Sequence, residues 1–289
     1  MTLAPPCEAC GEATAEARIS AMCVLWRCPR CGHVLRDLAR CRAGARAHPW
    51  GGSEALDRVR LALTRQRLRT LLPGRTGGDV LEVGFGRGLL LASLLAEGHR
   101  VSGVDPGALG LDLAPSLARG ATIYPVPVED ASLPAGRFDL VYGIHVVEHL
   151  RDPAIAFGAW HRALRPGGRL YLITPNARSA GLSLFRDRWW NLEDPTHVRF
   201  FSPASIGLML EAAGFEGIRW RAPVWDSLTM EVSSVLRTFR NPATSGDHGV
   251  LGGGPAWPAY ALGVPLALIA RFAWPAVRPS MEVMARRPS

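Results

Sequence analysis

The stretch VLEVGFGRG, residues 80–88, decides the fold, because an apolar run there ends in three closely spaced glycines. LLLASLLAEG (89–98) continues it with helical spacing, and HRVSGVD (99–105) follows as a second apolar run that ends in Asp105. Glycines let the backbone turn sharply and approach a ligand, and the start of a helix offers free N–H groups. A carboxylate at the end of the next strand can accept both hydroxyls of a ribose. This order of strand, glycine turn, helix and acid predicts a nucleoside-cofactor site.

The spacing of the glycines distinguishes between two nucleoside cofactors. The dinucleotide fingerprint is GxGxxG, whereas residues 82–88 follow the pattern ExGxGxG. Glu82 facing the binding crevice would attract a positively charged ligand group and repel a pyrophosphate. S-adenosylmethionine carries an ammonium and a sulfonium, so the sequence favours this cofactor over NAD.

Beyond Gly78, apolar runs of strand length alternate with helical stretches. Strands separated by helices predict a parallel sheet with crossover helices, and runs this apolar predict a sheet covered on both faces. The expected fold is α/β: a Rossmann-like, doubly wound, mostly parallel seven-stranded sheet with a small N-terminal zinc ribbon and a hydrophobic insertion before the last strand. The predicted strands are 79–84, 99–105, 121–128, 137–144, 168–174, 215–222 and 280–287, and the predicted helices after the first are 89–98, 152–164 and 203–213.

Several of these segments carry a resemblance to a known family. RFDLVYGIHVVEHLRDP (137–153) and LRPGGRLYLITPN (164–176) are similar to the fourth-strand and fifth-strand segments of class I S-adenosylmethionine-dependent methyltransferases, and VLEVGFGRG and GVDP resemble that family's first two motifs. THVRFFSPASIGLMLEAAGF (196–215) resembles the later part of a subgroup that acts on small molecules, including quinone precursors, glycans and natural products. The resemblance covers about residues 79–217. It implies an enzyme that methylates a small-molecule, glycan or lipid-linked acceptor, with a hydroxyl oxygen as the expected target.

The resemblance also implies roles for individual residues in cofactor binding. Glu82 and the glycine loop match the site for the amino-acid moiety, and Asp105 matches the ribose acid. Glu129 matches the acid near the adenine amine, a role that Asp130 could share. The predicted cofactor-binding residues are Glu82, Gly84, Phe85, Gly86, Gly88, Asp105, Pro106, Glu129, Asp130 and, through its backbone, His145.

Three histidines are candidates for removing the proton of a hydroxyl acceptor. His145 and His149 follow the fourth strand of the domain, at the edge of the sheet where the acceptor should lie. His149 matches a histidine that serves as general base in some members of the family, and an unperturbed histidine is well tuned for that task. The alternative is that His149 packs against the following helix or caps it. His197, at the expected substrate lid, is the third catalytic candidate.

Two cysteine pairs, Cys7-x₂-Cys10 and Cys28-x₂-Cys31, are each followed by glycine. Four thiolates at this spacing predict a closed, tetrahedral, structural zinc site. Cys23 and Cys41 have no partner at ligand spacing, and Cys23 is expected in the core. Residues 1–50 are therefore the predicted zinc-ribbon segment, 51–78 a linking amphipathic helix, and 79–289 the methyltransferase domain with residues 223–279 as a hydrophobic insertion or lid.

Composition and charge narrow the functional class. The 289 residues are 48% hydrophobic and 20% charged, which excludes a disordered or fibrous chain. All 33 basic residues are arginine, and residues 1–75 hold 13 of them against 6 acids. An RNA methyltransferase guided by a basic ribbon is therefore an alternative, although residues 76–289, with 20 arginines against 19 acids, offer RNA little attraction. A second alternative is a methyltransferase-like binding subunit without turnover.

Residues 249–277 form a stretch with one charged residue, Arg271. Its apolar run before Arg271, residues 255–270, is short for a bilayer span, and Pro258 and Pro265 are expected to divide it into short pieces. The sequence predicts a hydrophobic element near the acceptor entrance with Trp257, Tyr260 and Trp274 as anchors and Arg271 snorkelling. A homodimer contact and a peripheral membrane contact are the alternatives. The N-terminus lacks a signal-peptide pattern, so a cytoplasmic protein is expected, with membrane association as an alternative.

Overall fold

The structure is a computed structural model, and it describes residues 4–41, 54–107, 112–239 and 257–289, with the backbone alone at residues 54–57 and 257. The chain divides into two compact units. One comprises Met1–Arg60, Pro175–Ile206 and Ala222–Met281, and the other comprises Leu61–Thr174, Gly207–Arg221 and Glu282–Ser289. Each unit is assembled from segments distant in the sequence, and the boundaries expected at residues 50 and 78 stay a prediction.

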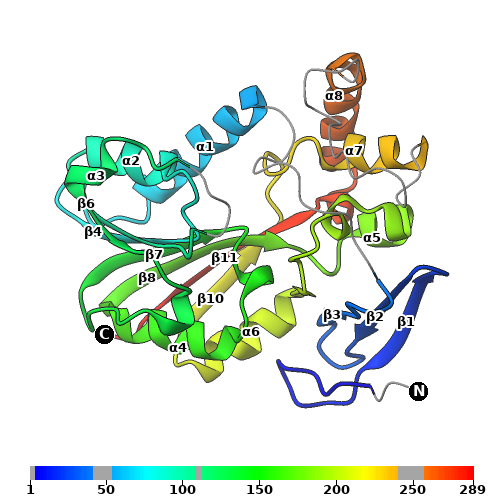
Figure 1. The fold of residues 1–289 in the computed structure, drawn as a ribbon, viewed down its shortest axis with the longest axis horizontal. Helices are drawn as coiled ribbons and strands as arrows, with labels where there is room; N and C mark the ends of the chain where they lie inside the picture. The colour runs from blue at the N-terminus through cyan, green and yellow to red at the C-terminus, as the bar shows by residue number, and fades with distance from the viewer. Residues whose placement is uncertain (1–3, 42–53, 108–111, 240–256) are drawn as a thin grey trace. The chain divides into compact units, whose positions relative to one another are not determined.

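The second unit is built on a seven-stranded sheet of the order β10-β11-β8-β7-β4-β5-β6 (Figure 1). The strands β8, β7, β4, β5 and β6 run parallel, and β10 pairs antiparallel with β11. All seven predicted strands are present, so the predicted α/β fold is confirmed. Their bounds are β4 Asp79–Val83, β5 Arg100–Val104, β6 Ala121–Tyr124, β7 Phe138–Ile144, β8 Leu164–Pro175, β10 Glu216–Arg221 and β11 Ser280–Arg286.

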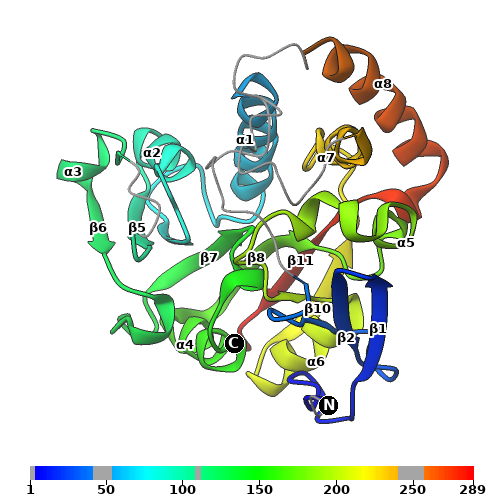
Figure 2. The same cartoon turned by 45° about the vertical axis from the view of Figure 1, so that its right-hand side comes forward.

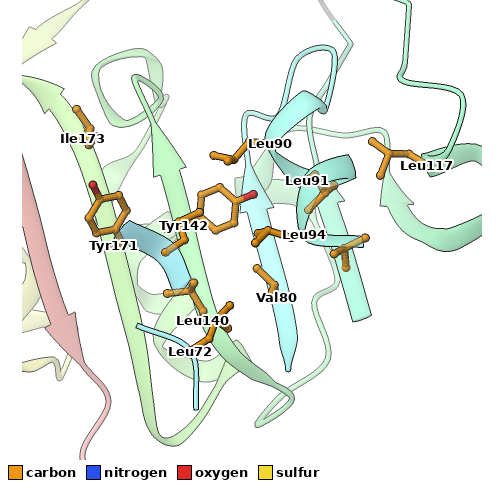
Figure 3. Close-up of a cluster of buried hydrophobic side chains, with 12 residues drawn as sticks. Leu72, Val80, Leu90, Leu91, Leu94, Leu117, Leu140, Tyr142, Tyr171 and Ile173 are labelled. Atoms are coloured by element: carbon orange, nitrogen blue, oxygen red, sulfur yellow. The ribbon is translucent and has the colours of Figure 1, made fainter. Parts of the chain in front are cut away.

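Helices cover both faces of this sheet, as the apolar strands required. The other elements of the α/β architecture are α1 Glu54–Arg69, α2 Leu89–Ala96, α3 Leu117–Gly120, α4 Pro153–Ala163, α6 Pro203–Ala212 and the 3₁₀ turns η1 Val128–Asp130 and η2 Val147–His149. Leu68, Leu90, Leu94 and the sheet residues Tyr142 and Tyr171 belong to one buried cluster (Figure 3). Asp152 begins α4 as an N-cap, because its carboxylate accepts hydrogen bonds from the N–H groups of two residues in the first turn. The predicted N-cap of α1, Ser53, lies outside the described residues.

The first unit contains a second sheet, of the order β1-β2-β3-β9. The strands are β1 Ala15–Ser20, β2 Cys23–Arg27, β3 Val34–Arg36 and β9 Arg199–Phe200. The ribbon therefore shares its sheet with a segment about 160 residues away, and its buried residues Leu25 and Val34 share one core with Trp189 and Phe200. The helices of this unit are α5 Ala180–Phe185, α7 Met230–Leu236 and α8 Trp257–Ala273, with the 3₁₀ turns η3 Arg186–Arg188, η4 Trp190–Leu192, η5 Arg237–Phe239 and η6 Pro275–Val277.

The structure corrects three expectations about the insertion. The helix α8 is continuous over 17 residues with Pro265 inside it, so the expected division into short pieces is wrong. Pro258 lies in the first turn, where its missing N–H would have no helical partner anyway. Tyr260 and Arg271 are buried rather than at a wet boundary. Trp274 is half exposed as expected, and residues 249–256 and the side chain of Trp257 lie outside the described part. No described helix is long and apolar enough to cross a bilayer.

Candidate functional site

The glycine loop has the sharp turn that the sequence predicts. Gly84, Gly86 and Gly88 have φ values of 67°, 53° and 69°, which lie in the left-handed region. A Cβ atom at Gly84 would lie 2.7 Å from the Val146 Cγ2 atom, and a Cβ atom at Gly88 would collide with Leu117. Both positions therefore require glycine for conformation and for space. Phe85 belongs to the same loop, and its aromatic ring lies against Gly103 of β5.

Asp105 ties the glycine loop to the end of β5. Its Oδ2 atom accepts a hydrogen bond from the Gly86 N–H at 2.9 Å, and its Oδ1 atom accepts one from the Gly107 N–H at 2.7 Å. A carboxylate has about four lone-pair positions, so both oxygens can accept a further hydroxyl proton each. The structure thus places the predicted ribose acid beside the predicted loop. Pro106 follows it and is exposed.

Glu82 is buried beneath the loop and does not project into solvent. The Tyr142 hydroxyl donates a hydrogen bond to its Oε2 atom at 2.8 Å. Burial raises the pKa of Glu82 to about 8, and the charge of Asp105 acts in the same direction. The Leu91 N–H, in the first turn of α2, hydrogen-bonds Glu82 and favours its charged form. A cationic ligand group near this carboxyl would favour its ionised form.

Strand β7 ends in a strained turn that carries His145. Its φ value is 54°, a conformation that is uncommon for residues other than glycine. The His145 N–H donates to the carbonyl of Ile173 at 2.7 Å, and its Nδ1 atom lies 3.3 Å from Glu148 Oε1. Glu148 is fully buried, and the Thr174 hydroxyl donates to its other oxygen at 2.9 Å. This link between the ends of β7 and β8 was not predicted, although a glutamate inside the apolar run VVEHL is a signal for it.

The glycine loop follows β4 and the turn with His145 follows β7, so the two leave neighbouring strands, since β4 pairs with β7 as well as with β5. His149 lies in the same turn as His145. Its N–H donates to the carbonyl of Val146 at 3.0 Å, and its side chain is partly exposed. The histidine therefore stands at the carboxyl edge of the sheet, where ligands of parallel α/β folds bind.

His197 belongs to the other compact unit, where it packs among residues of the loop before β9 and of β9 itself. The ring is nearly buried, its Nδ1 atom donates to the carbonyl of Asn191 at 2.6 Å, and it stacks edge-on against Phe200. The Arg36 guanidinium, from the ribbon, donates to the carbonyls of Leu192 and Asp194 in the loop before it. These hydrogen bonds between Arg36 and the loop before His197 were not predicted.

Glu129 and Asp130 are both engaged with the start of α4. The carboxylate of Glu129 accepts a hydrogen bond from the Arg151 N–H at 2.7 Å, and Asp130 forms an ion pair with the Arg151 guanidinium at 2.7 Å. Asp130 is exposed, while the Glu129 side chain is nearly buried. The predicted adenine contact is therefore still a prediction for both residues.

Cys7, Cys10, Cys28 and Cys31 form one cluster, in which the four sulfur atoms lie within 4.8 Å of one another. The Sγ atoms of Cys7 and Cys31, and those of Cys10 and Cys28, are 3.5 Å apart. Tetrahedral zinc with bonds of about 2.3 Å separates its sulfur ligands by about 3.8 Å, so the donor set fits this metal. The two glycines turn the chain as predicted, because Gly11 and Gly32 have φ values of 73° and 74° and donate to the carbonyls of Cys7 and Cys28.

Cys23 and Cys41 form a disulfide bond that was not predicted, and both residues are buried. The sequence offered no ligand spacing for them, and their pairing depends on the return of the chain after β3. Cys23 lies in the core as expected.

Fold and glycine loop together define a class I S-adenosylmethionine-dependent methyltransferase, and the comparisons with known proteins agree. The family model described as a methyltransferase domain matches residues 56–219, more than half of the chain. The chain belongs to this family, and it is an S-adenosylmethionine-dependent enzyme of that class.

Relatives and solved structures locate the chain within a large class. Ubiquinone biosynthesis O-methyltransferase of Xanthomonas axonopodis pv. citri is 34% identical over 180 residues, which cover 56% of this chain and 70% of the relative. The Aeromonas salmonicida enzyme of the same name is 30% identical over 152 residues, which cover 49% and 64%. The chain thus spans about two thirds of the length of these relatives.

Two solved structures share the fold at low sequence identity. Phosphoethanolamine N-methyltransferase 2 of Haemonchus contortus, in complex with S-adenosylmethionine, has a TM-score of 0.53 and 18% identity, over 78% of this chain and 53% of that chain. The [4+2]-cyclase SpnF has a TM-score of 0.54 and 19% identity, over 86% and 88%. Since these two proteins are named for different reactions, the shared fold does not by itself define the reaction.

Proposed function

We propose that this chain transfers a methyl group from S-adenosylmethionine to a hydroxyl oxygen of a small-molecule, glycan or lipid-linked acceptor. One observation carries the proposal. Asp105, which accepts a hydrogen bond from the glycine loop, follows β5, and the turn 145–149 with its two histidines follows β7. Both strands flank β4. The cofactor and a general base are thereby assigned to one edge of the sheet. The relatives are named O-methyltransferases, which supports oxygen as the acceptor atom.

The chain's own residues would bind the cofactor, orient the acceptor and remove one proton. Bound S-adenosylmethionine supplies an electrophilic methyl group on its sulfonium. Asp105 and the loop glycines hold the ribose and the amino-acid moiety. His149 accepts the hydroxyl proton, while the contact between His145 and the buried Glu148 fixes the turn that carries His149. General base catalysis of this kind contributes about 10²–10⁴-fold.

The test is a product search with labelled cofactor. The enzyme is incubated with labelled S-adenosylmethionine and one of three extracts, which contain metabolites, glycans or lipids. Methylated products are then identified by mass spectrometry. The His149→Asn variant should bind cofactor like the wild type and form the product slowly. The Asp105→Ala variant should bind the cofactor more weakly than the wild type and also form the product slowly. A product methylated on nitrogen or carbon would contradict the assignment of oxygen.

RNA methylation is the second candidate, and one observation favours it. Arg27 and Arg30 of the ribbon are exposed and form no ion pair with any residue that the structure describes. Adding total RNA as a further acceptor in the same assay separates the two functions. Label in RNA that disappears in the double variant Arg27→Gln, Arg30→Gln, without loss of cofactor binding, would support this candidate. Cofactor binding without any methylated product would support the third candidate, a binding subunit.

We also propose that Cys7, Cys10, Cys28 and Cys31 hold one structural zinc ion. The sulfur spacing supports this proposal, and the closed set of four thiolates excludes a catalytic role for the metal. Metal analysis of reduced, purified protein should give one zinc per chain. The exposed Met22 of the same ribbon offers a control, since Met22→Ser should keep the metal that Cys10→Ser loses. Wild-type protein without zinc would end this proposal.

A further inference from the structure

The helix α8 has two apolar faces, and the residues that the structure describes cover only one of them. Its inner face, which includes Tyr260, Val264 and the buried Arg271, packs on α7. Gly263 lets the two helices approach closely, because a Cβ atom there would lie 2.7 Å from Val232 Cγ2. Figure 2 shows α8 beside α7 in this unit, and their contact anchors α8 as a fixed element.

The opposite face of α8 is exposed and has no polar side chain. Leu262, Leu266, Ile269 and Phe272 recur at helical spacing and are 60–73% exposed. Trp274 continues this face, and Trp225 joins it through an edge-on contact with Phe272 at a centroid distance of 6.4 Å. We define these six residues as the α8 face. A continuous apolar surface of this kind marks an interaction site.

The charged group of α8, the Arg271 guanidinium, is paired with residues inside this unit. The Arg271 guanidinium forms a two-pronged ion pair with Glu231, with both distances 2.7 Å, and donates to the carbonyls of Val224, Asp226 and Ser227. Arg271 therefore fixes α8 against α7 and the loop that carries Trp225. The α8 face is held in place from within, and its exposure does not reflect a detached helix.

The charges beside the α8 face are positive and lack acidic partners. Arg178 is exposed, and the next residue, Ser179, donates to the carbonyl of Val277 just beyond α8. Arg278 donates only to backbone carbonyls, those of Arg271 and Ala222. Neither arginine forms an ion pair with any residue in the described part of the chain. The nearby acids of this unit, Glu231 and Glu193, are paired with Arg271 and Arg237.

We propose that the α8 face binds the surface of an anionic phospholipid bilayer, with the helix lying in the plane of the interface. Its apolar side chains match the acyl boundary, its two tryptophans match the headgroup level, and the unpaired arginines match anionic headgroups. A second copy of this chain would bring the same face and the same arginines, whereas the acids of this unit nearest to them in the described chain, Glu231, Glu193 and Asp226, are paired or buried. The helix is too short to span a bilayer, which agrees with binding along the surface.

The test is vesicle flotation of the full-length protein. The vesicles contain phosphatidylcholine alone or with about one third phosphatidylglycerol, a mixture that gives the bilayer a negative surface potential. The wild type should float with the anionic vesicles and be released by high salt. The double variant Ile269→Ser, Phe272→Ser should lower the partition coefficient about 10- to 100-fold, because each side chain loses much of its burial. Arg178→Gln should weaken binding to anionic vesicles only.

A matched control removes exposed apolar side chains elsewhere. The double variant Met22→Ser, Ile155→Ser changes residues that are 73% and 52% exposed and should float like the wild type. Circular dichroism and cofactor binding report whether each variant folds. If the wild type stays unbound, or if the α8 variant floats equally well, the inference is wrong. It is also wrong if the wild type is a dimer without lipid and the α8 variant is a monomer. Flotation requires neither cofactor nor acceptor, so its result is separate from that of the proposed reaction.

Discussion

Replacing Glu82 by glutamine should change how the stability of the protein depends on pH. The Glu82 carboxyl is buried, accepts a hydrogen bond from Tyr142, and has a pKa raised from 4.5 to about 8 by burial. A glutamine has almost the same shape, and its amide oxygen can accept the same hydrogen bond. The substitution therefore removes the titration while keeping the contact.

The sign of the effect follows from proton linkage. The native carboxyl keeps its proton up to about pH 8, whereas the unfolded chain loses it above about 4.5. The contribution of Glu82 to the free energy of unfolding is thus complete below pH 4.5 and is lost as the pH rises to 8. One pKa unit corresponds to about 1.4 kcal/mol, so between pH 5 and pH 8 the wild type should lose about 3 kcal/mol that the variant keeps.

Urea unfolding of both proteins at pH 5, 6, 7 and 8, without cofactor, measures this difference. All other ionisable groups are the same in both proteins, so their contributions cancel in the comparison. Asp79→Asn is a matched control, because the Arg100 guanidinium holds the pKa of Asp79 below its usual range and the carboxylate stays ionised above pH 5. Its difference from the wild type should be constant over this range. Parallel curves for the wild type and Glu82→Gln would refute the reasoning.

Other substitutions test the site more directly. Gly84→Ala should abolish cofactor binding and lower stability by about 1–3 kcal/mol, measured by calorimetry and urea unfolding, because its Cβ atom would meet Val146 in a left-handed conformation. Asp105→Ala should weaken cofactor binding about tenfold or more in calorimetry, since a charge-assisted hydrogen bond contributes about 1.5–3 kcal/mol; wild-type affinity would count against the assignment. His149→Asn should lower turnover about 10²–10⁴-fold with unchanged cofactor affinity; full activity would make the histidine structural. Cys10→Ser should lose the zinc ion, measured by metal analysis.

The sequence predicted the elements whose signal is local. The strands of the second unit other than β10 are rich in apolar residues, and the residue types of the glycine loop predict its conformation. The end of β6 was predicted too late, because residues 121–128 contain no charged residue and are mostly apolar, while the strand stops at Tyr124. Pro125 and Pro127 cannot donate to a ladder, so they leave this segment as an extended turn into η1. Pro125 and Pro127 indicated where the strand ends, but the prediction relied on the apolar residues instead.

The helix α8 shows the opposite error, in which prolines were given too much weight. Pro265 removes one backbone hydrogen bond, yet the helix continues because its inner face is buried against α7 and Arg271 bonds three carbonyls of the loop beside it. Burial of Val264 and Tyr260 offsets the local cost. The partners of Arg271 lie 40 to 47 residues away, so no local pattern could have shown that this arginine would be buried rather than exposed.

The ribbon and the segment of His197 are joined by contacts that no spacing rule reveals. Arg36 is buried, and burial lowers the pKa of its guanidinium to about 10. It donates to the carbonyls of Leu192 and Asp194, more than 150 residues away, and β3 pairs beside it with β9. Cys28 and Cys31, two of the proposed zinc ligands, are connected to β3 by a few residues, so a loss of the proposed metal should loosen β3 and the loop that holds His197. The proposed zinc ion would therefore stabilise the segment of His197, a candidate catalytic residue, as well as the ribbon itself.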